Sequence, residues 1–414
     1  MAPNRPGPDL RSATPMSTRR RSKSTQQNDE RILDAALREI YDVGVDALGM
    51  TAVARRAGLT TGALYGRYEN GSELAAAVWT ARARDRHFAL LDRAIAALVD
   101  RDDTVALDDL LRELTSPRKE TVVSLELLAS ARRIDELEEV VLTDVRQWVA
   151  DWGAGPRARR RRRRAQVVYT LGTIWGILLH AAPGRLRLDW SPLLRRLAWS
   201  FAQPYAGPTT RLVVDDMKSV HAQTGDPVED ALVDAVAAIV ARVGMERATG
   251  SRIARRAGLT SGAIYGRYET KVDLLEHAIE ILLAQRFTDD LTAIDEVLVD
   301  DDPGRASARL FAGYLSQPRQ EWRLFRIESY LAARHQPRVA ASLHRVQEAA
   351  KDDYLTAIGA RTREERRVLE ILARSAQIGP IGLAFADLLI PGVPNIDWRL
   401  VFEPLFSPRP TTSG

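Results

Sequence analysis

Two short stretches of the sequence carry the same small set of contact-making side chains. Residues 60–67 read TTGALYGR and residues 260–267 read TSGAIYGR. The leading hydroxyls can bond phosphates or base edges, and the alanine methyl can meet a thymine methyl. The small glycine and alanine allow close approach, and the tyrosine and arginine can reach phosphates on a groove wall. The pattern indicates non-covalent contact with nucleic acid.

Signatures of catalysis and of metal binding are missing from the sequence. The chain has no cysteine, and its six histidines are scattered without ligand spacing. It has no phosphate-binding glycine loop, no HExxH and no GxSxG. We therefore expect no catalytic residues, no metal site and no cofactor, and an enzyme is the less favoured interpretation.

The two stretches belong to a longer internal repeat. Residues 51–69 and 251–269 are identical at fourteen of nineteen positions. Looser similarity continues on both sides, at an offset that drifts as small loop insertions would make it drift. Two copies of one unit of roughly 200 residues therefore account for nearly all of the 414 residues.

Helical periodicity runs through both copies, and alternating strand patterns are absent. The predicted fold class is all-α, with two units that each have a three-helix head and a helical body. The predicted segments are a basic disordered tail (1–27), head 1 (28–74), body 1 (75–206), a linker (207–227), head 2 (228–274), body 2 (275–408) and a tail (409–414).

Each head predicts a helix-turn-helix unit. In copy one we expect a short helix over about 50–57, a tight turn at Gly58, and a second helix over about 61–68 capped by Thr60. Gly44 is expected to end the preceding helix in the left-handed conformation. Units of this kind place the second helix in the major groove of DNA.

At these residues the chain resembles the tetracycline repressor (TetR) family of bacterial transcription regulators. The family signature runs approximately I-A-x-x-A-G-V-S-x-G-x-[LI]-Y-x-[HY]-F-x-[ST]-K-x-x-L, and residues 53–74 and 253–274 both follow it. The resemblance implies a DNA-binding head on a helical body that binds a small-molecule effector. It implies a ligand-responsive repressor that reads a pseudo-palindromic, double-stranded operator. The alternative is a ligand-binding or protein-interaction module in which one or both heads no longer read DNA.

The resemblance also implies which residues face DNA. The candidate DNA-binding residues are Thr51, Thr60, Thr61, Gly62, Ala63, Tyr65, Arg67, Thr249, Ser251, Arg252, Thr260, Ser261, Gly262, Ala263, Tyr265, Arg267 and Lys271. Three of the family's positions differ between the copies. Copy two has Thr249, Arg252 and Lys271, where copy one has Gly49, Ala52 and Gly71. Copy one is therefore expected to grip the DNA backbone less tightly.

Family members act as dimers joined by a four-helix bundle of their last two helices. Here the corresponding segments are 165–182 with 190–203, and 364–390 with 397–406. We expect them to pair within one chain as a pseudo-dimer, which would present two similar reading helices to half-sites about 10 bp apart. A homodimer of two chains, with four heads, is the alternative.

The remaining expectations concern ligands, charge and location. Aromatic side chains of the bodies are weak candidates for effector binding, with ordinary core packing as the alternative: Trp148, Trp175, Trp322, Phe325 and Tyr330. The arginine run 159–164 is expected to be a solvated helix start balanced by the acidic segment 135–139. The alternatives are a second contact with the DNA backbone and a site for an anionic ligand. No segment has the length of a membrane span or the form of a signal peptide, so a cytoplasmic protein without membrane contact is predicted.

Overall fold

The computed structural model describes residues 23–100, 104–181, 189–210, 212–214, 217–284, 302–358 and 362–407. Every regular element in those ranges is helical, which confirms the predicted all-α fold. Helix α1 begins at Lys23, so the prediction of a disordered tail 1–27 is wrong for residues 23–27. The rest of that tail and the predicted tail 409–414 lie outside the described residues. Within the described part of the chain, no helix is both long and apolar enough to cross a membrane.

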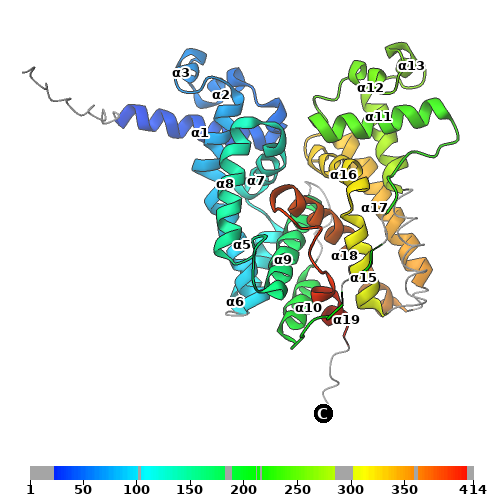
Figure 1. Ribbon diagram of the computed structural model, residues 1–414. Coiled ribbons are helices and arrows are strands. Elements are labelled where there is room, and N and C mark those ends of the chain that lie inside the picture. Colours follow the sequence, from blue (N-terminus) through cyan, green and yellow to red (C-terminus); the bar gives the residue numbers. More distant parts are fainter. Residues whose placement is uncertain are drawn as a thin grey trace, which may run out of the picture.

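Copy one forms one side of the molecule, with its head at one end (Figure 1). The head consists of α1 (Lys23–Val43), α2 (Met50–Ala57) and α3 (Thr61–Tyr65). The body consists of α4 (Gly71–Val78), α5 (Arg84–Ile95), α6 (Thr104–Thr115), α7 (Lys119–Ser130), α8 (Asp135–Asp151), α9 (Arg161–His180) and α10 (Ser191–Ala202). Short 3-10 segments (Val45–Ala47, Ala131–Arg133) and π-helical segments (Trp79–Ala83, Ala96–Asp100) join some of them.

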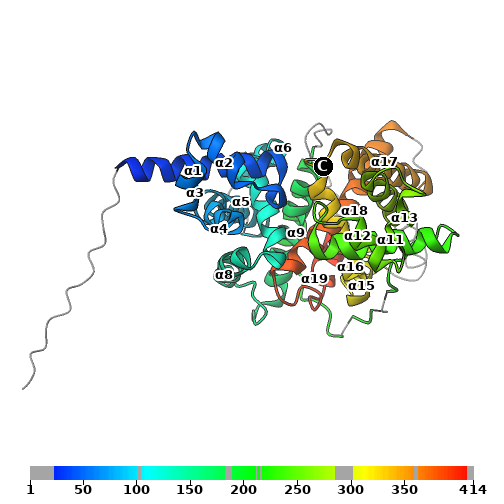
Figure 2. The same cartoon turned by 90° about the horizontal axis from the view of Figure 1, so that it is seen from above.

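Copy two forms the other side, and its head lies at the same end of the molecule as the first (Figures 1 and 2). The head consists of α11 (Pro227–Val243), α12 (Gly250–Arg256) and α13 (Ser261–Tyr265). The body consists of a helix over 271–284, α15 (Pro303–Tyr314), the 3-10 segment Gln317–Arg319, α16 (Gln320–Ala332), α17 (Pro337–Ile358), α18 (Arg363–Leu389) and α19 (Arg399–Phe406).

Helices α9 and α18 pack together where the two bodies meet. Every residue of α9 over 165–179 is buried, so this helix has no solvent-exposed face there. Gly172 approaches Gly382 so closely that a Cβ on Gly382 would lie 1.7 Å from the Gly172 carbonyl oxygen. Only residues without a side chain permit this approach. Helices α10 and α19 also pack against each other, so the two bodies meet through the segments expected from the sequence.

The arginine run binds helix ends. The Arg162 guanidinium donates to the Gln203 carbonyl at 2.7 Å, just after α10. Arg164 donates to the Gly392 carbonyl at 3.1 Å, just after α18. Carbonyl oxygens are good acceptors for the several N–H donors of a guanidinium group. These arginines therefore hold the start of α9 to both copies.

Candidate nucleic-acid interface

A glycine turn positions the second helix of head 1. Gly58 has φ 66° and ψ 38°, the predicted left-handed conformation. Leu64 is fully buried and anchors α3 in the head. The Thr60 hydroxyl accepts the Ala63 N–H at 3.2 Å and caps the helix as predicted. Helix α3 ends at Tyr65, three residues earlier than expected.

Head 2 repeats the turn with small differences. Gly258 has φ 71°, and Ile264 is buried as the anchor of α13. The Thr260 side chain makes no capping hydrogen bond.

The expectation for Gly44 of head 1 is wrong in part, because its φ is positive (88°) but its ψ is 160°. The extended ψ turns the chain directly into the 3-10 segment that follows α1.

The predicted contact residues lie on the outer surface of both heads. Tyr65 and Tyr265 are 56% and 60% exposed, which is high for large side chains of this kind. The other exposed candidates are Thr51, Thr60, Thr61, Gly62, Thr249, Ser251, Arg252, Thr260, Ser261, Gly262 and Arg267, and the half-buried ones are Ala63, Arg67, Ala263 and Lys271. Exposed tyrosines at equivalent positions of two copies suit a surface that binds another molecule.

Both terminal arginines of the reading segments bind carboxylates of their own head. Arg67 pairs with Asp29 of α1 at 2.5 Å. Arg267 pairs with Asp226, the N-cap of α11, at 2.8 Å. No local pattern of residues indicates these partners. For either arginine to bind DNA, a phosphate must replace the carboxylate or share the guanidinium group with it. The planar fork of guanidinium donors can bind a phosphate and a carboxylate alike.

The two heads differ in how their helix starts are built. The Thr249 hydroxyl accepts the Arg252 N–H at 3.4 Å and caps α12, whereas Gly49 gives α2 no side-chain cap. Lys271 begins the next helix of copy two. At its counterpart Gly71, a Cβ would lie 3.2 Å from a backbone carbonyl, so copy one has little room for a side chain there.

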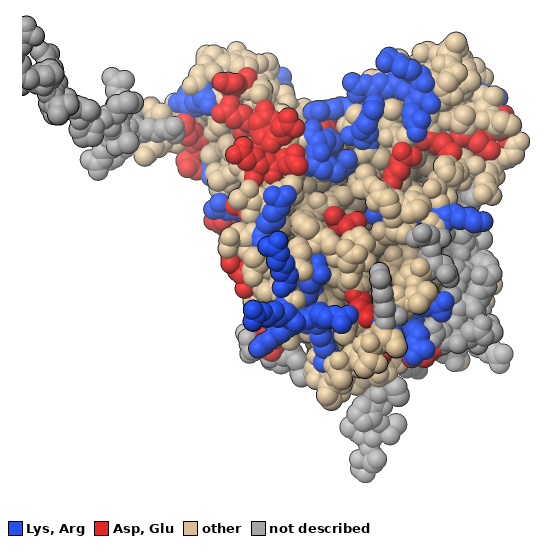
Figure 3. All heavy atoms as spheres, viewed as in Figure 1, with Lys and Arg blue, Asp and Glu red and all other residues tan. Residues whose placement is uncertain are grey.

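The surroundings of the two heads also differ in charge. In Figure 3, acidic side chains gather over the head of copy one and basic side chains over the head of copy two. Helix α8 begins with Asp135, Glu136 and Glu138, all exposed. Glu136 accepts a hydrogen bond from Asn70, just before α4, at 3.4 Å. The expectation that this acidic segment balances the arginine run is wrong, because it lies beside head 1 instead.

This acidic helix start predicts a penalty on DNA binding by head 1. Glu136→Gln should raise affinity for DNA about two- to fivefold at low salt, because it removes one repulsive charge beside the phosphates. Asp151→Asn, at the far end of the same helix, is the matched control. Fluorescence anisotropy over a salt series measures both. Equal effects of the two variants would contradict a local cause.

The five aromatic candidates for effector binding are packing residues in this structure. Trp175, Trp322, Phe325 and Tyr330 are almost fully buried, and Trp148 is half-buried. Trp175 donates its indole N–H to Nε2 of His87 at 3.0 Å. Burial lowers the pKa of His87 to about 3, which keeps the ring a neutral acceptor. None of the five lines the cavity beside Arg133 and His335 or the cavity beside Arg305 and Arg309, so an effector site at these residues stays a prediction.

A short helix, a glycine turn and an exposed second helix, present twice, define a helix-turn-helix DNA-binding protein. The family model described as "Bacterial regulatory proteins, tetR family" matches residues 32–78 and 232–278. The chain is therefore a DNA-binding transcription regulator with two tetR-family units in tandem. Both the predicted family and the tandem arrangement are confirmed.

The chain was also compared with solved structures and with curated proteins. A proposed transcriptional regulator of Streptomyces coelicolor A3(2) is 25% identical, and the similarity covers 42% of this chain and 96% of that one, with a TM-score of 0.31. None of the curated proteins compared matches this chain.

Proposed function

We propose that this protein is a ligand-responsive repressor in which one chain, as a pseudo-dimer, reads two similar half-sites. The observation that supports the proposal most is the pair of near-identical reading surfaces, which face the same end of the molecule (Figure 1). The packing of α9 on α18 supports a single-chain unit, because it joins the bodies without a second chain. The half-sites would be centred about one helical turn, roughly 10 bp, apart.

Selection of bound duplexes from a random DNA library tests this proposal. The expected result is two similar, inverted half-sites with a constant spacing. A single half-site would contradict reading by two heads. Random recovery without enrichment would contradict sequence reading altogether, and would favour a module that binds a ligand or a protein partner.

Sedimentation of the protein with the selected duplex tests the single-chain arrangement. A single chain is expected without DNA, and one chain per duplex is expected in the complex. A stable two-chain species in both states would support a homodimer with four heads instead.

The effector would act through the bodies. The larger cavity, of about 680 Å³, lies where the linker meets α15 and α19. It is lined by Arg305, Arg309 and Arg399, together with Glu403. Arg399 already pairs with Asp397 at 2.8 Å, and Arg305 approaches Glu403 at 3.9 Å. Three guanidinium groups against two carboxylates still favour an acidic effector over an apolar one. A thermal-shift screen of small carboxylates and phosphates tests this, and a hit whose shift survives Arg309→Ala would bind elsewhere.

A further inference from the structure

A second repeated segment lies at the junction of the heads with the bodies. Residues 125–133 read LELLASARR, and residues 327–335 read IESYLAARH. Both segments come from equivalent helices, α7 and α16, and each ends beside the heads. The glutamates Glu126 and Glu328 correspond, and so do Arg133 and His335. The last position is therefore arginine in copy one and histidine in copy two.

Arg133 reaches from copy one into copy two. Its guanidinium pairs with Glu328 at 3.4 Å, and both side chains are more than nine-tenths buried. It also lies against Gly244, the residue after α11 in head 2, where a Cβ would come within 3.0 Å of its Cζ. The same guanidinium donates to Asp46 of head 1 at 2.6 Å. Arg247 of head 2 approaches that carboxylate at 3.4 Å.

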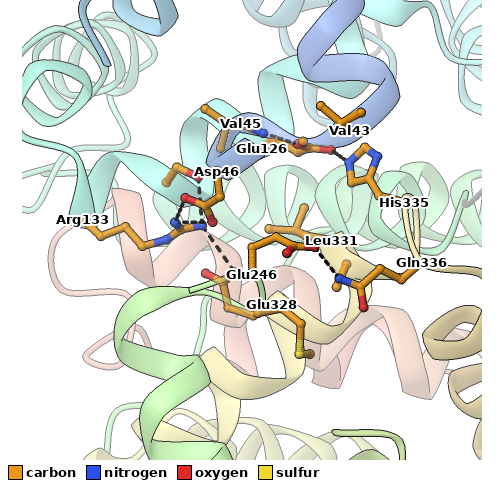
Figure 4. Close-up of a pocket in the computed structure, with 14 residues that line it drawn as sticks. Val43, Val45, Asp46, Glu126, Arg133, Glu246, Glu328, Leu331, His335 and Gln336 are labelled. Carbon is orange, nitrogen blue, oxygen red and sulfur yellow. Dashed lines mark hydrogen bonds and ion pairs between the residues drawn. The ribbon is translucent and has the colours of Figure 1, made fainter. Parts of the chain in front are cut away.

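His335 makes the reciprocal contacts from copy two into copy one. Its Nε2 bonds Glu126 at 2.5 Å, and its Nδ1 bonds the Asp42 carbonyl at 3.2 Å. It lies against Gly44, the residue after α1, where a Cβ would come within 3.2 Å of the ring. The second oxygen of Glu126 accepts the Val45 N–H at 3.2 Å. Figure 4 shows the Arg133 and His335 contacts on either side of a small cavity of about 40 Å³.

The two sets of contacts share two features, although Glu328 also binds Arg132 at 2.8 Å and the hydrogen bond of Arg133 to a head goes to Asp46 of head 1. In each, a cation at the end of a body helix pairs with the glutamate of the other copy and abuts the glycine turn of the other copy's head. We propose that Arg133 and His335 are positioning residues that hold each head through the opposite body, and that the contact to head 1 is released when His335 loses a proton. This inference rests on the proposed reading of two half-sites, because it explains what fixes the distance between the readers.

The geometry at His335 requires a proton on both ring nitrogens. Both partners, a carbonyl oxygen and a carboxylate oxygen, are acceptors, whereas a neutral imidazole has only one N–H to donate. Burial lowers the pKa of His335, but the hydrogen bond and charge of Glu126 and the Asp42 carbonyl outweigh it, so the pKa lies above its ordinary value. The contact is thus complete below about pH 6.5 and is lost as pH rises through the folded-state pKa.

The charged groups around this histidine come from several elements. They are Glu126 and Arg133 of copy one's body, Asp42 and Asp46 of head 1, Glu246 of head 2, and Glu328 and Arg334 of α16 and its end. Two further histidines bind carboxylates of α11: His221 pairs with Asp234 and His277 with Glu229. A substitution at His335 leaves these two histidines in place, so it separates their effect from that of His335.

Pulsed electron paramagnetic resonance between the heads provides that test. The chain has no cysteine, so Arg38→Cys on α1 and Arg242→Cys on α11, both exposed, give one spin label in each head. Distances are measured at about pH 5.5 and about pH 8.5, on either side of the ordinary histidine pKa. The variants are His335→Gln, which removes the charge, and His335→Arg, which introduces the arginine that copy one has at the equivalent position 133. His344→Gln, at an exposed histidine of α17, is the matched control.

The doubly labelled protein and its His344→Gln form should give a narrow distribution at low pH that broadens roughly twofold at high pH. His335→Arg should stay narrow at both, and His335→Gln should be broad at both. The proposal would be overturned if the distance distribution of the parent protein did not change with pH. It would also be overturned if the pH effect persisted in His335→Arg. If His335→Gln does not fold, the parent protein and His335→Arg, each measured at both pH values, still test the proposal. The measurement needs no DNA, so failure of operator binding remains a separate result.

Discussion

Gly382→Ala should cost about 3 kcal/mol or more of unfolding free energy, although it adds a single methyl group. The new Cβ would lie 1.7 Å from the Gly172 carbonyl oxygen and 2.9 Å from the Gly176 amide nitrogen. Both are backbone atoms of α9, so no side chain can turn away. Helices α9 and α18 would have to separate, which would expose the apolar surface between the two bodies.

Urea unfolding followed by circular dichroism measures this loss. Gly155→Ala is the matched control, because a Cβ there has no atom within 4 Å. That variant should be nearly neutral. Similar losses in the two variants would show that the close approach of α9 and α18 does not limit stability.

The second large effect concerns the exposed tyrosines. Tyr265→Ala should weaken operator binding about 10- to 100-fold, because head 2 combines this contact with the capped α12 and with Lys271. Tyr65→Ala should weaken it only a few-fold, because head 1 has Gly71 at the lysine position and Glu136 nearby.

Titration of the selected operator by fluorescence anisotropy measures both variants. Each tyrosine is more than half exposed, so the melting temperatures should stay close to that of the parent protein. Equal losses of affinity would mean that the surrounding charge does not distinguish the heads. A larger loss for Tyr65→Ala would reverse the proposed order.

Local features of the heads could be predicted because they depend on residues close in sequence. The boundaries of α2 and the left-handed Gly58 follow from residue types within one turn. The packing of α9 on α18 could be expected because residues 165–179 of α9 are apolar apart from Gln166, Thr170 and Thr173. In each case one strong requirement, either a positive φ or an apolar surface, outweighs the alternatives.

Contacts between the copies could not be predicted in the same way. His335 and Glu126 are far apart in sequence, and only packing brings them together. The predicted partners of the arginine run are wrong because its actual partners include backbone carbonyls, such as that of Gln203, which no side-chain pattern reveals. The repeated glutamate at 126 and 328 was a usable signal, since it recurs with the same spacing to Arg133 and His335.

The unlike heads give the bound complex a direction. A dimer of identical chains on a palindrome looks the same from either end. Here Lys271 and the basic surroundings belong to one head, and Gly71 and the acidic start of α8 to the other. An operator with one strong and one weak half-site would therefore fix which copy lies upstream. The bound chain would then present the same side to the transcription machinery in every complex.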